Sequence, residues 1–243
     1  MEIWKQMAES HKAILLITLS VVLLYLIIRL VKKVRNKKRL KTVTSIKRGT
    51  PSERHLVLEL LKYGIPSQTI FHDLCIKKSK NEFAQIDVVI ATTEGIIVIE
   101  VKDYSGWIFG SNNQSYWTQV LAYGKRKYRF YNPIKQNNSH INALKNQLSQ
   151  FKNIPFFSVI VFYGDCELKE INYVPKGTFL AKSHRVFEVL KEIKMNNEPA
   201  PFTDKREVIS CLEQAVKNGE NTDTQEKHIK NINDMLGKDR IFN

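Results

Sequence analysis

The stretch that decides the fold runs from residue 85 to residue 102 and reads Gln85-Ile86-Asp87-Val88-Val89-Ile90-Ala91-Thr92-Thr93-Glu94-Gly95-Ile96-Ile97-Val98-Ile99-Glu100-Val101-Lys102. Two apolar, β-branched runs flank a turn that contains glycine, which predicts an antiparallel hairpin. A two-residue turn at Thr93 and Glu94 would place Asp87 directly across from Glu100. A bulge that uses Gly95 would shift this pairing, and the sequence leaves both registers open.

Alternation along the second strand places Glu100 and Lys102 on one face of the hairpin. In the first register Asp87 would join them, so that two carboxylates and one ammonium group converge. Carboxylates can hold Mg²⁺, which polarises a phosphate and lowers the pKa of a bound water, and a lysine can support the nucleophile or the developing charge. A surface salt bridge at a strand end is the alternative. The spacing alone does not separate the two, because Asp…Glu-x-Lys often occurs by chance.

Motifs on both sides of the hairpin supply a more specific context. Their types and order resemble the nuclease-related domain (NERD) family, which is similar to the restriction-endonuclease-like PD-(D/E)xK superfamily. The resemblance covers about residues 53–150. Two positions depart from the family pattern, Ser52 where glycine is usual and Val88 where histidine is common, and neither removes a candidate ligand. The motifs are Ser52-Glu53, Gln85-Ile86-Asp87, Ile99 through Gly110, Trp117, and Asn132-Pro133 through Ile141.

The resemblance implies a fold, a reaction and a set of site residues. The fold would be α/β, a restriction-endonuclease-like mixed β-sheet flanked by helices. Asp87 and Glu100 match the metal-binding positions of the family. Lys102 matches its catalytic lysine and Glu53 matches the acid of its first helix, for which a simple helix-N-terminal acid is the alternative. The cofactor would be Mg²⁺ or Mn²⁺, and the substrate would be DNA.

Three more polar residues are candidates for contact with nucleic acid. Gln85 shares a strand face with Asp87 and could bind a phosphate or a metal-bound water, with a structural amide as the alternative. Gln136 and His140 are four residues apart and so stack on one helix face. In the superfamily that the chain resembles, a Gln-x-x-x-aromatic pair often reaches the site, so both could contact DNA. His140 could instead be an ordinary exposed helix residue.

A basic segment between residues 125 and 131 is a further candidate surface. Lys125 and Arg126 begin it, and tyrosines alternate with the cations that follow. Cations bind backbone phosphates and aromatic rings stack on bases, so this segment could hold nucleic acid. A solvated hairpin is the alternative.

The N-terminal part carries a long apolar run. Residues 13–28 contain no charge, and the run extends to residue 31 if Arg29 snorkels to the lipid headgroups. A bilayer core needs about 20 apolar residues, so residues 13–31 predict a transmembrane helix. A buried soluble helix is one alternative and a cleaved signal peptide is another. Against the signal peptide stand the lack of net positive charge before the run and the lack of a small-x-small site after it.

Positive charge is concentrated directly after this run. Residues 29–52 hold ten lysines and arginines and no acid, which leaves +4 of the net charge of +14 for residues 53–243. The positive-inside rule then places residues 32 onward in the cytoplasm and residues 1–12 outside. The basic residues would lie against anionic lipids, and a nucleic-acid tether is the alternative.

The three cysteines, Cys75, Cys166 and Cys211, agree with this location. They are odd in number and widely separated, and they contain no Cys-x-x-Cys pair. This pattern argues against a disulfide framework or a structural zinc site and suits a reducing cytoplasm.

Hydrophobic periodicity predicts alternating helices and strands over the rest of the chain. The expected helices are 53–63, 133–151, 183–195 with Ser183 as its cap, 204–217 and 224–236. The expected strands, besides the hairpin, are 69–76, 107–110, 116–121, 127–131, 156–163 and 178–181. The expected organisation is an outer segment 1–12, a transmembrane helix 13–31, a basic linker 32–52, a NERD-like domain 53–165 and a mostly helical extension 166–243.

Three functions fit these observations. The first is a membrane-anchored, cytoplasm-facing, metal-dependent nuclease that hydrolyses DNA. The second is a catalytically weak or inactive membrane-tethered module that keeps the fold and binds a protein partner. The third is a nuclease whose cleft is covered by the chain after Asp165.

Overall fold

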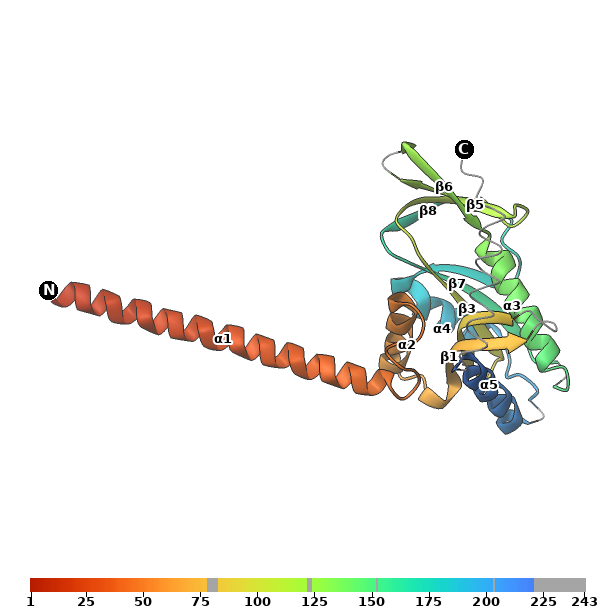
Figure 1. Ribbon diagram of the computed structural model, residues 1–243, viewed down its shortest axis with the longest axis horizontal. Helices are drawn as coiled ribbons and strands as arrows, with labels where there is room; N and C mark the ends of the chain where they lie inside the picture. Colours follow the sequence, from red (N-terminus) through yellow and green to blue (C-terminus); the bar gives the residue numbers. More distant parts are fainter. Residues whose placement is uncertain (78–82, 122–123, 152, 203, 221–243) are drawn as a thin grey trace.

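The computed structural model describes residues 1–77, 83–121, 124–151, 153–202 and 204–220. One long N-terminal helix projects from an α/β body that contains the other elements (Figure 1). The α-helices are α1 (Glu2–Leu40), α2 (Pro51–Tyr63), α3 (Pro133–Gln147), α4 (Val186–Asn196) and α5 (Lys205–Glu220). The strands are β1 (Ile70–Lys77), β2 (Phe83–Ala91), β3 (Ile96–Asp103), β4 (Gly106–Ser111), β5 (Tyr116–Leu121), β6 (Arg126–Tyr131), β7 (Phe156–Tyr163), β8 (Cys166–Asn172) and β9 (Thr178–Lys182).

The main sheet contains five strands in the order β1-β2-β3-β7-β9. Strand β2 pairs antiparallel with both β1 and β3, whereas β7 pairs parallel with both β3 and β9. The sheet is therefore mixed, as the sequence predicts. Strand β7 lies inside the sheet between β3 and β9, which explains why its sequence is a continuous apolar run.

The pairing of β2 with β3 settles the register of the hairpin. Val88 pairs with Ile99 and Ala91 pairs with Ile96, which leaves Thr93 and Glu94 at the tip. The two-residue turn is thereby confirmed. Gly95 has a φ of 148°, and a Cβ atom there would lie 2.4 Å from the carbonyl oxygen of residue 155, so only glycine fits.

Helices cover both faces of the main sheet. On one face, α2 and α4 pack against Ile97 and Ile99 of β3. On the other face, α3 and α5 pack against Ile96 and Val98. Side chains of successive strand residues point to opposite faces, so one apolar strand contributes to both cores. The fold class is therefore α/β with a mixed sheet flanked by helices, as expected.

A second sheet, which the sequence does not predict, extends the fold in the order β6-β5-β4-β8. Strands β4, β5 and β6 lie close to their expected positions. Strand β8 was not expected, because six of its seven residues are exposed or half-exposed and three of them are charged. The buried ring of Trp117 stacks on Phe162 of the main sheet and so joins the two sheets.

The part of the chain after residue 165 is built into the body. Strand β9 pairs with β7 as the edge of the main sheet. Val208, Leu212 and Ala215 of α5 are buried in the same core as α3. The expectation that Ser183 caps α4 is wrong, because a 3₁₀ turn (Ser183–Arg185) precedes the helix and no side chain caps it. The helix expected at 224–236 lies outside the described residues.

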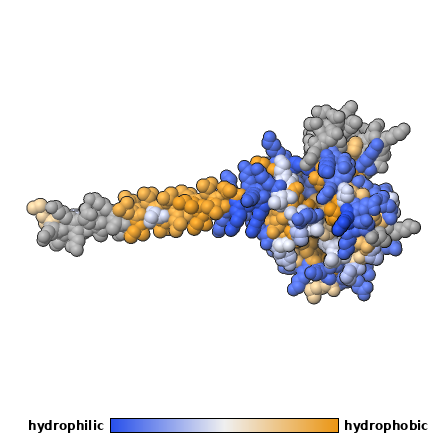
Figure 2. Space-filling model, turned by 90° about the horizontal axis from the view of Figure 1, so that it is seen from below, coloured by the Kyte–Doolittle hydropathy of each residue, from blue (hydrophilic) through white to orange (hydrophobic). Residues whose placement is uncertain are grey.

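Helix α1 continues without a break through the apolar run and the basic residues up to Leu40. The stretch Leu15–Leu40 contains a window apolar enough to cross a membrane, and none of that window is buried against the body. Figure 2 shows a hydrophobic surface along part of this helix and a hydrophilic surface at its end next to the body. The helix has the length and hydropathy of a membrane span, and a signal sequence would meet the same criteria.

Candidate functional site

Asp87 lies at the point where β2 stops pairing with β3. The register of the hairpin places it across from Glu100, one position beyond the Val88–Ile99 pair. Its Oδ2 atom accepts a hydrogen bond of 2.7 Å from the backbone N–H of Val101. The carboxylate thus occupies the place of the next backbone hydrogen bond and is held between the two strands.

Glu100 is almost completely buried, with 2% of its side chain exposed. Its Oε1 atom lies 2.7 Å from the Nζ atom of Lys102, on the same face of β3. Its Oε2 atom lies 3.3 Å from the Nε2 atom of His140, at an angle that forms no hydrogen bond. Lys102 also donates a hydrogen bond of 3.0 Å to the side-chain oxygen of Gln136.

Helix α3 supplies Gln136 and His140 from one face, as their spacing predicts. The helix begins at Asn132, whose side chain accepts from the N–H of Ile134 and donates to the carbonyl of Gln114. Asn132 is therefore a structural cap. His140 is buried rather than an exposed helix residue.

Glu53 approaches from helix α2 on another side. Its pKa is lowered, because His72 and Thr50 stabilise the carboxylate more than burial destabilises it. Thr50 donates a hydrogen bond of 2.7 Å to Oε1 of Glu53, and the Nε2 atom of His72 lies 3.3 Å from Oε2. Ser52, which stands where the family usually has glycine, donates a hydrogen bond to Asp103 and ties this helix to β3.

Three acids affect the pKa values of the site and are here called the acidic cluster: Glu53, Asp87 and Glu100. Burial raises the pKa of Asp87 well above its usual value, and the charges of Glu100 and Glu53 raise it further. Burial acts on Glu100 in the same direction, but Lys102 and His140 outweigh it and lower its pKa. Although it is buried, Lys102 has a raised pKa because Glu100 stabilises its charge. The cluster therefore favours an additional cation near Asp87.

The other candidate residues lie further from this centre. The side chain of Gln85 donates a hydrogen bond of 2.5 Å to Asp73, which also binds Arg48. Lys125 and Arg126 are exposed at the end of the β5–β6 hairpin next to its turn. Within the described residues, no recorded hydrogen bond or ion pair joins Lys125 or Arg126 to the acidic cluster.

Sequence reasoning missed two residues that hold the site together. His72 is completely buried beside Glu53. Asn137 is also completely buried, and its side chain donates to the carbonyl of Val98 and to the hydroxyl of Ser158. A polar His-Asp pair inside an otherwise apolar strand was the available signal for His72. The position of Asn137 next to Gln136 on the helix gave no such signal.

The donor set suits a hard divalent cation, with Asp87 and Glu100 as the candidate ligands. Within the described residues, no three His, Cys, Asp or Glu side chains are close enough to form a complete metal site. Mg²⁺ does not require three, because it usually keeps several waters and binds one or two carboxylates plus substrate phosphates. Among the described residues the buried Oε2 atom of Glu100 accepts no hydrogen bond, so it is a candidate oxygen ligand for a cation, with Nε2 of His140 3.3 Å away.

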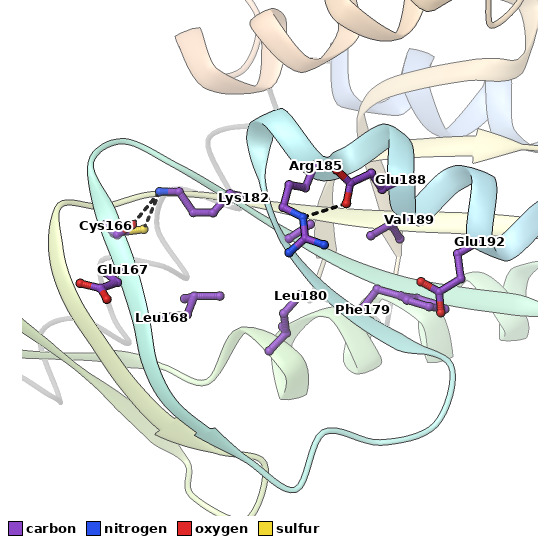
Figure 3. Close-up of a pocket in the computed structure, with 11 residues that line it drawn as sticks. Cys166, Glu167, Leu168, Phe179, Leu180, Lys182, Arg185, Glu188, Val189 and Glu192 are labelled. Carbon is purple, nitrogen blue, oxygen red and sulfur yellow. Dashed lines mark hydrogen bonds and ion pairs between the residues drawn. The ribbon is translucent and has the colours of Figure 1, made fainter.

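A pocket of about 430 Å³ lies elsewhere, between β8, β9 and α4 (Figure 3). Lys182 reaches across it and donates hydrogen bonds to the carbonyls of Gly164 and Cys166. Arg185 pairs with Glu188 at its rim. No residue of the acidic cluster lines this pocket, so it is separate from the candidate site.

Residues 48–163 match the nuclease-related domain (NERD) family. The chain is also similar to an uncharacterized protein from Bacillus anthracis, with 25% identity over 194 residues that cover 79% of this chain and 86% of the relative. No solved structure matches the chain significantly. The family match includes every residue of the acidic cluster, together with Lys102, Gln136 and His140. Residues 48–163, which carry the whole candidate site, are therefore similar to the nuclease-related domain (NERD) family.

Proposed function

We propose that this protein is a metal-dependent nuclease that hydrolyses phosphodiester bonds in DNA. The observation that carries the proposal is the hairpin register, which sets Asp87 across from Glu100 with Lys102 bound to Glu100. Asp87 and Glu100 would hold Mg²⁺ or Mn²⁺. When bound, the ion would polarise the scissile phosphate and lower the pKa of a water molecule.

Lys102 acts as a cation in this proposal. Its raised pKa keeps the ammonium group charged at neutral pH, so it does not serve as a general base. It instead stabilises the negative charge that develops on the phosphate oxygens in the transition state. Gln136 accepts a hydrogen bond from Lys102 and fixes the direction of the ammonium group.

Glu53 and His140 complete the site from the two helices. Glu53 is ionised and adds negative charge that favours the metal ion at Asp87. His140 lies against Glu100, and neither of its buried ring nitrogens makes a hydrogen bond within the described part of the chain; in this proposal the ring would donate to a phosphate oxygen that enters the site. Gln85 supports the site through Asp73, and Lys125 and Arg126 would contact the DNA backbone beyond it.

The protein would be held at the cell membrane by α1, with its N-terminus outside and the nuclease domain in the cytoplasm. The apolar, unburied surface of α1 and the basic residues that follow support this arrangement. Those basic residues would contact anionic lipid headgroups. A cysteine placed at Ser10 should react with an impermeant maleimide on intact cells, whereas a cysteine at exposed Lys191 should react only after lysis. The opposite labelling pattern would show that the protein has the reverse orientation in the membrane.

A membrane-tethered binding module with little or no catalysis is the second candidate. It is favoured by the low net charge after residue 52 and by the proposed membrane anchor, which would restrict access to nucleic acid. In this case the domain would present its surface to a protein partner. The two candidates differ in whether the protein binds a divalent ion at Asp87 and Glu100.

The deciding experiment uses the full chain in neutral lipid nanodiscs, with linear and circular DNA and either Mg²⁺ or Mn²⁺. Glu100→Gln removes a charge from the acidic cluster, and Glu59→Gln makes the same change on the outer part of α2. Metal-dependent cleavage should be lost in Glu100→Gln and retained in Glu59→Gln. Cleavage that persists unchanged in Glu100→Gln would exclude this mechanism.

A further inference from the structure

The segment between α1 and α2, residues 41–52, is here called the connecting segment. It does not behave as a loose tether, because three of its polar residues, Thr44, Arg48 and Ser52, bind groups of the body, although most of the segment is exposed. Leu40, directly before it, is buried in the core that α2 covers. Thr44 is 7% exposed, and Arg48 forms a buried ion pair of 2.9 Å with Asp73 of β1. The chain therefore leaves the anchor helix and enters the body at once.

Thr44 and His72 form a buried chain of contacts that ends at Glu53. The hydroxyl of Thr44 lies 2.7 Å from the Nδ1 atom of His72. The Nε2 atom on the other side of the ring lies 3.3 Å from the Oε2 atom of Glu53, within ion-pair distance but without the geometry of a hydrogen bond. If the hydroxyl donates to Nδ1, the neutral ring carries its proton on Nε2, facing the carboxylate.

Glu53 is enclosed by the connecting segment on its other sides. Thr50 binds both the side chain and the backbone N–H of Glu53. A Cβ atom at Gly49 would lie 2.3 Å from Oε2 of Glu53 and 2.6 Å from Nε2 of His72. Gly49 also has a φ of 60°, so this position leaves room for the Glu53–His72 contact only because it has no side chain.

Arg48 fixes the backbone that carries His72. Its guanidinium group binds both the carboxylate and the carbonyl oxygen of Asp73 and reaches the carbonyl of Val216 at the end of α5. Asp73 has a φ of 58°, an uncommon conformation for a residue with a side chain. The contacts of Arg48 hold this conformation and so hold the direction in which His72 points.

We infer that Thr44 and His72 are positioning residues for Glu53, and that the connecting segment is part of the nuclease site. This inference rests on the proposed nuclease function. The hydroxyl of Thr44 orients the ring of His72, and the ring holds the carboxylate of Glu53 toward Asp87. Because these contacts come from the segment that follows α1, they link the end of that helix to the site.

The test compares four variants of the full chain in neutral lipid nanodiscs. Thr44→Val removes the hydroxyl at nearly constant shape, and Thr44→Ser keeps it. His72→Gln places an amide near the position of Nε2, whereas His72→Ala does not. Thr42→Val is the matched control, because Thr42 is exposed and its hydroxyl donates to the carbonyl of Arg39 at the end of α1.

Thr44→Val should lower kcat for DNA cleavage by about 10- to 100-fold, the usual effect of losing a residue that orients a site group, with KM changed less than about twofold. Thr44→Ser should restore most of kcat, and Thr42→Val should have no effect. His72→Gln should retain more activity than His72→Ala. In the Glu53→Gln background, Thr44→Val should cause no further loss, because the group that it positions is already neutral.

Two results would overturn the inference. One is an unchanged kcat in Thr44→Val, while Glu100→Gln is inactive, which would leave the nuclease proposal intact. The other is an equal loss from Thr44→Val in the wild-type and Glu53→Gln backgrounds, which would show a general structural role.

A second readout does not depend on cleavage. Nitrogen NMR of ¹⁵N-histidine-labelled protein should show His72 with its proton on Nε2, and Thr44→Val should mix the two ring forms. If no DNA cleavage occurs with any metal, the nuclease proposal fails, and this spectrum still decides whether Thr44 orients His72. A ring form that does not respond to Thr44→Val would overturn the inference.

Discussion

The ammonium group of Lys102 lies 2.7 Å from a carboxylate oxygen of Glu100, two residues earlier on the same strand. Glu100 is buried and Lys102 is 17% exposed, so little water screens the pair. The pair leaves the second oxygen of Glu100 without a hydrogen bond, on the side of His140. One carboxylate can therefore hold the lysine and still offer an oxygen to a metal ion.

Replacement of Lys102 by methionine should lower kcat by about 10²- to 10³-fold at saturating metal, because a preorganised charge at the reacting phosphate is lost. Single-turnover cleavage of labelled DNA measures this effect. Lys62→Met on α2 is the control, since Lys62 pairs only with Glu59 on the surface. Wild-type rates in Lys102→Met would remove the lysine from the mechanism.

Asp87→Asn should abolish metal-dependent cleavage and yet stabilise the metal-free protein. Because the folded state raises the pKa of Asp87, ionisation of this group opposes folding. The opposition begins above the unfolded pKa of about 4 and is complete above the raised folded pKa, so stability is lost as pH rises. In EDTA, the melting temperature of Asp87→Asn should exceed that of the wild type most at high pH. An equal difference at all pH values would contradict this assignment.

Asn137→Ala should destabilise the fold by about 1–3 kcal/mol, because it leaves the buried partners of the amide unpaired. Urea unfolding monitored by tryptophan fluorescence measures the change. Asn142→Ala, on the exposed face of the same helix, should unfold at nearly the wild-type urea concentration. Equal midpoints for the two variants would show that the amide does not support the β3–β7 pair.

Charge reversal of Lys125 and Arg126 should weaken DNA binding and leave the chemical step unchanged. Each lost phosphate contact should reduce the slope of log affinity against log salt by about one. Binding measured without divalent metal at several salt concentrations tests this. Lys191→Glu on α4 makes the same type of change away from the hairpin. An unaltered slope in the Lys125→Glu, Arg126→Glu variant would place the DNA elsewhere.

Two C-terminal deletions test whether the last part of the chain covers the cleft or supports the fold. Deletion from residue 204 removes α5, whose apolar residues complete a core, so this variant should unfold or aggregate. Deletion of residues 221–243 keeps every described element. Higher cleavage rates in this shorter deletion would support a tail that covers the cleft, and unchanged rates would contradict it. Circular dichroism confirms that each variant is folded before its activity is compared.

The sequence predicted those parts of the molecule whose pattern is local. Two apolar, β-branched runs around a short turn predicted the β2–β3 hairpin. The sequence left its register open, and the structure sets Asp87 against Glu100. The spacing of Gln136 and His140 placed both on the inner face of α3. Strand β8 was missed because its residues are mostly exposed, and strand pairing at a sheet edge leaves little trace in hydropathy.

Contacts between distant segments could not be predicted in the same way. The contact of Thr44 with His72 joins residues 28 positions apart, and no periodicity links them. The connecting segment was expected to be a polar linker because its composition is polar. In the structure Thr44 and Arg48 of this segment bind His72 and Asp73 of the body, whereas most of its other residues are exposed.

The central claim is that Asp87 and Glu100 jointly bind one divalent ion. A crystal of the full chain or of its DNA complex, soaked in Mn²⁺ and measured at the manganese absorption edge, tests it directly. The account predicts one anomalous peak within bonding distance, about 2.0–2.3 Å, of an oxygen from each carboxylate. A fully soaked crystal with no peak between Asp87 and Glu100, or with manganese bound only elsewhere, would contradict it.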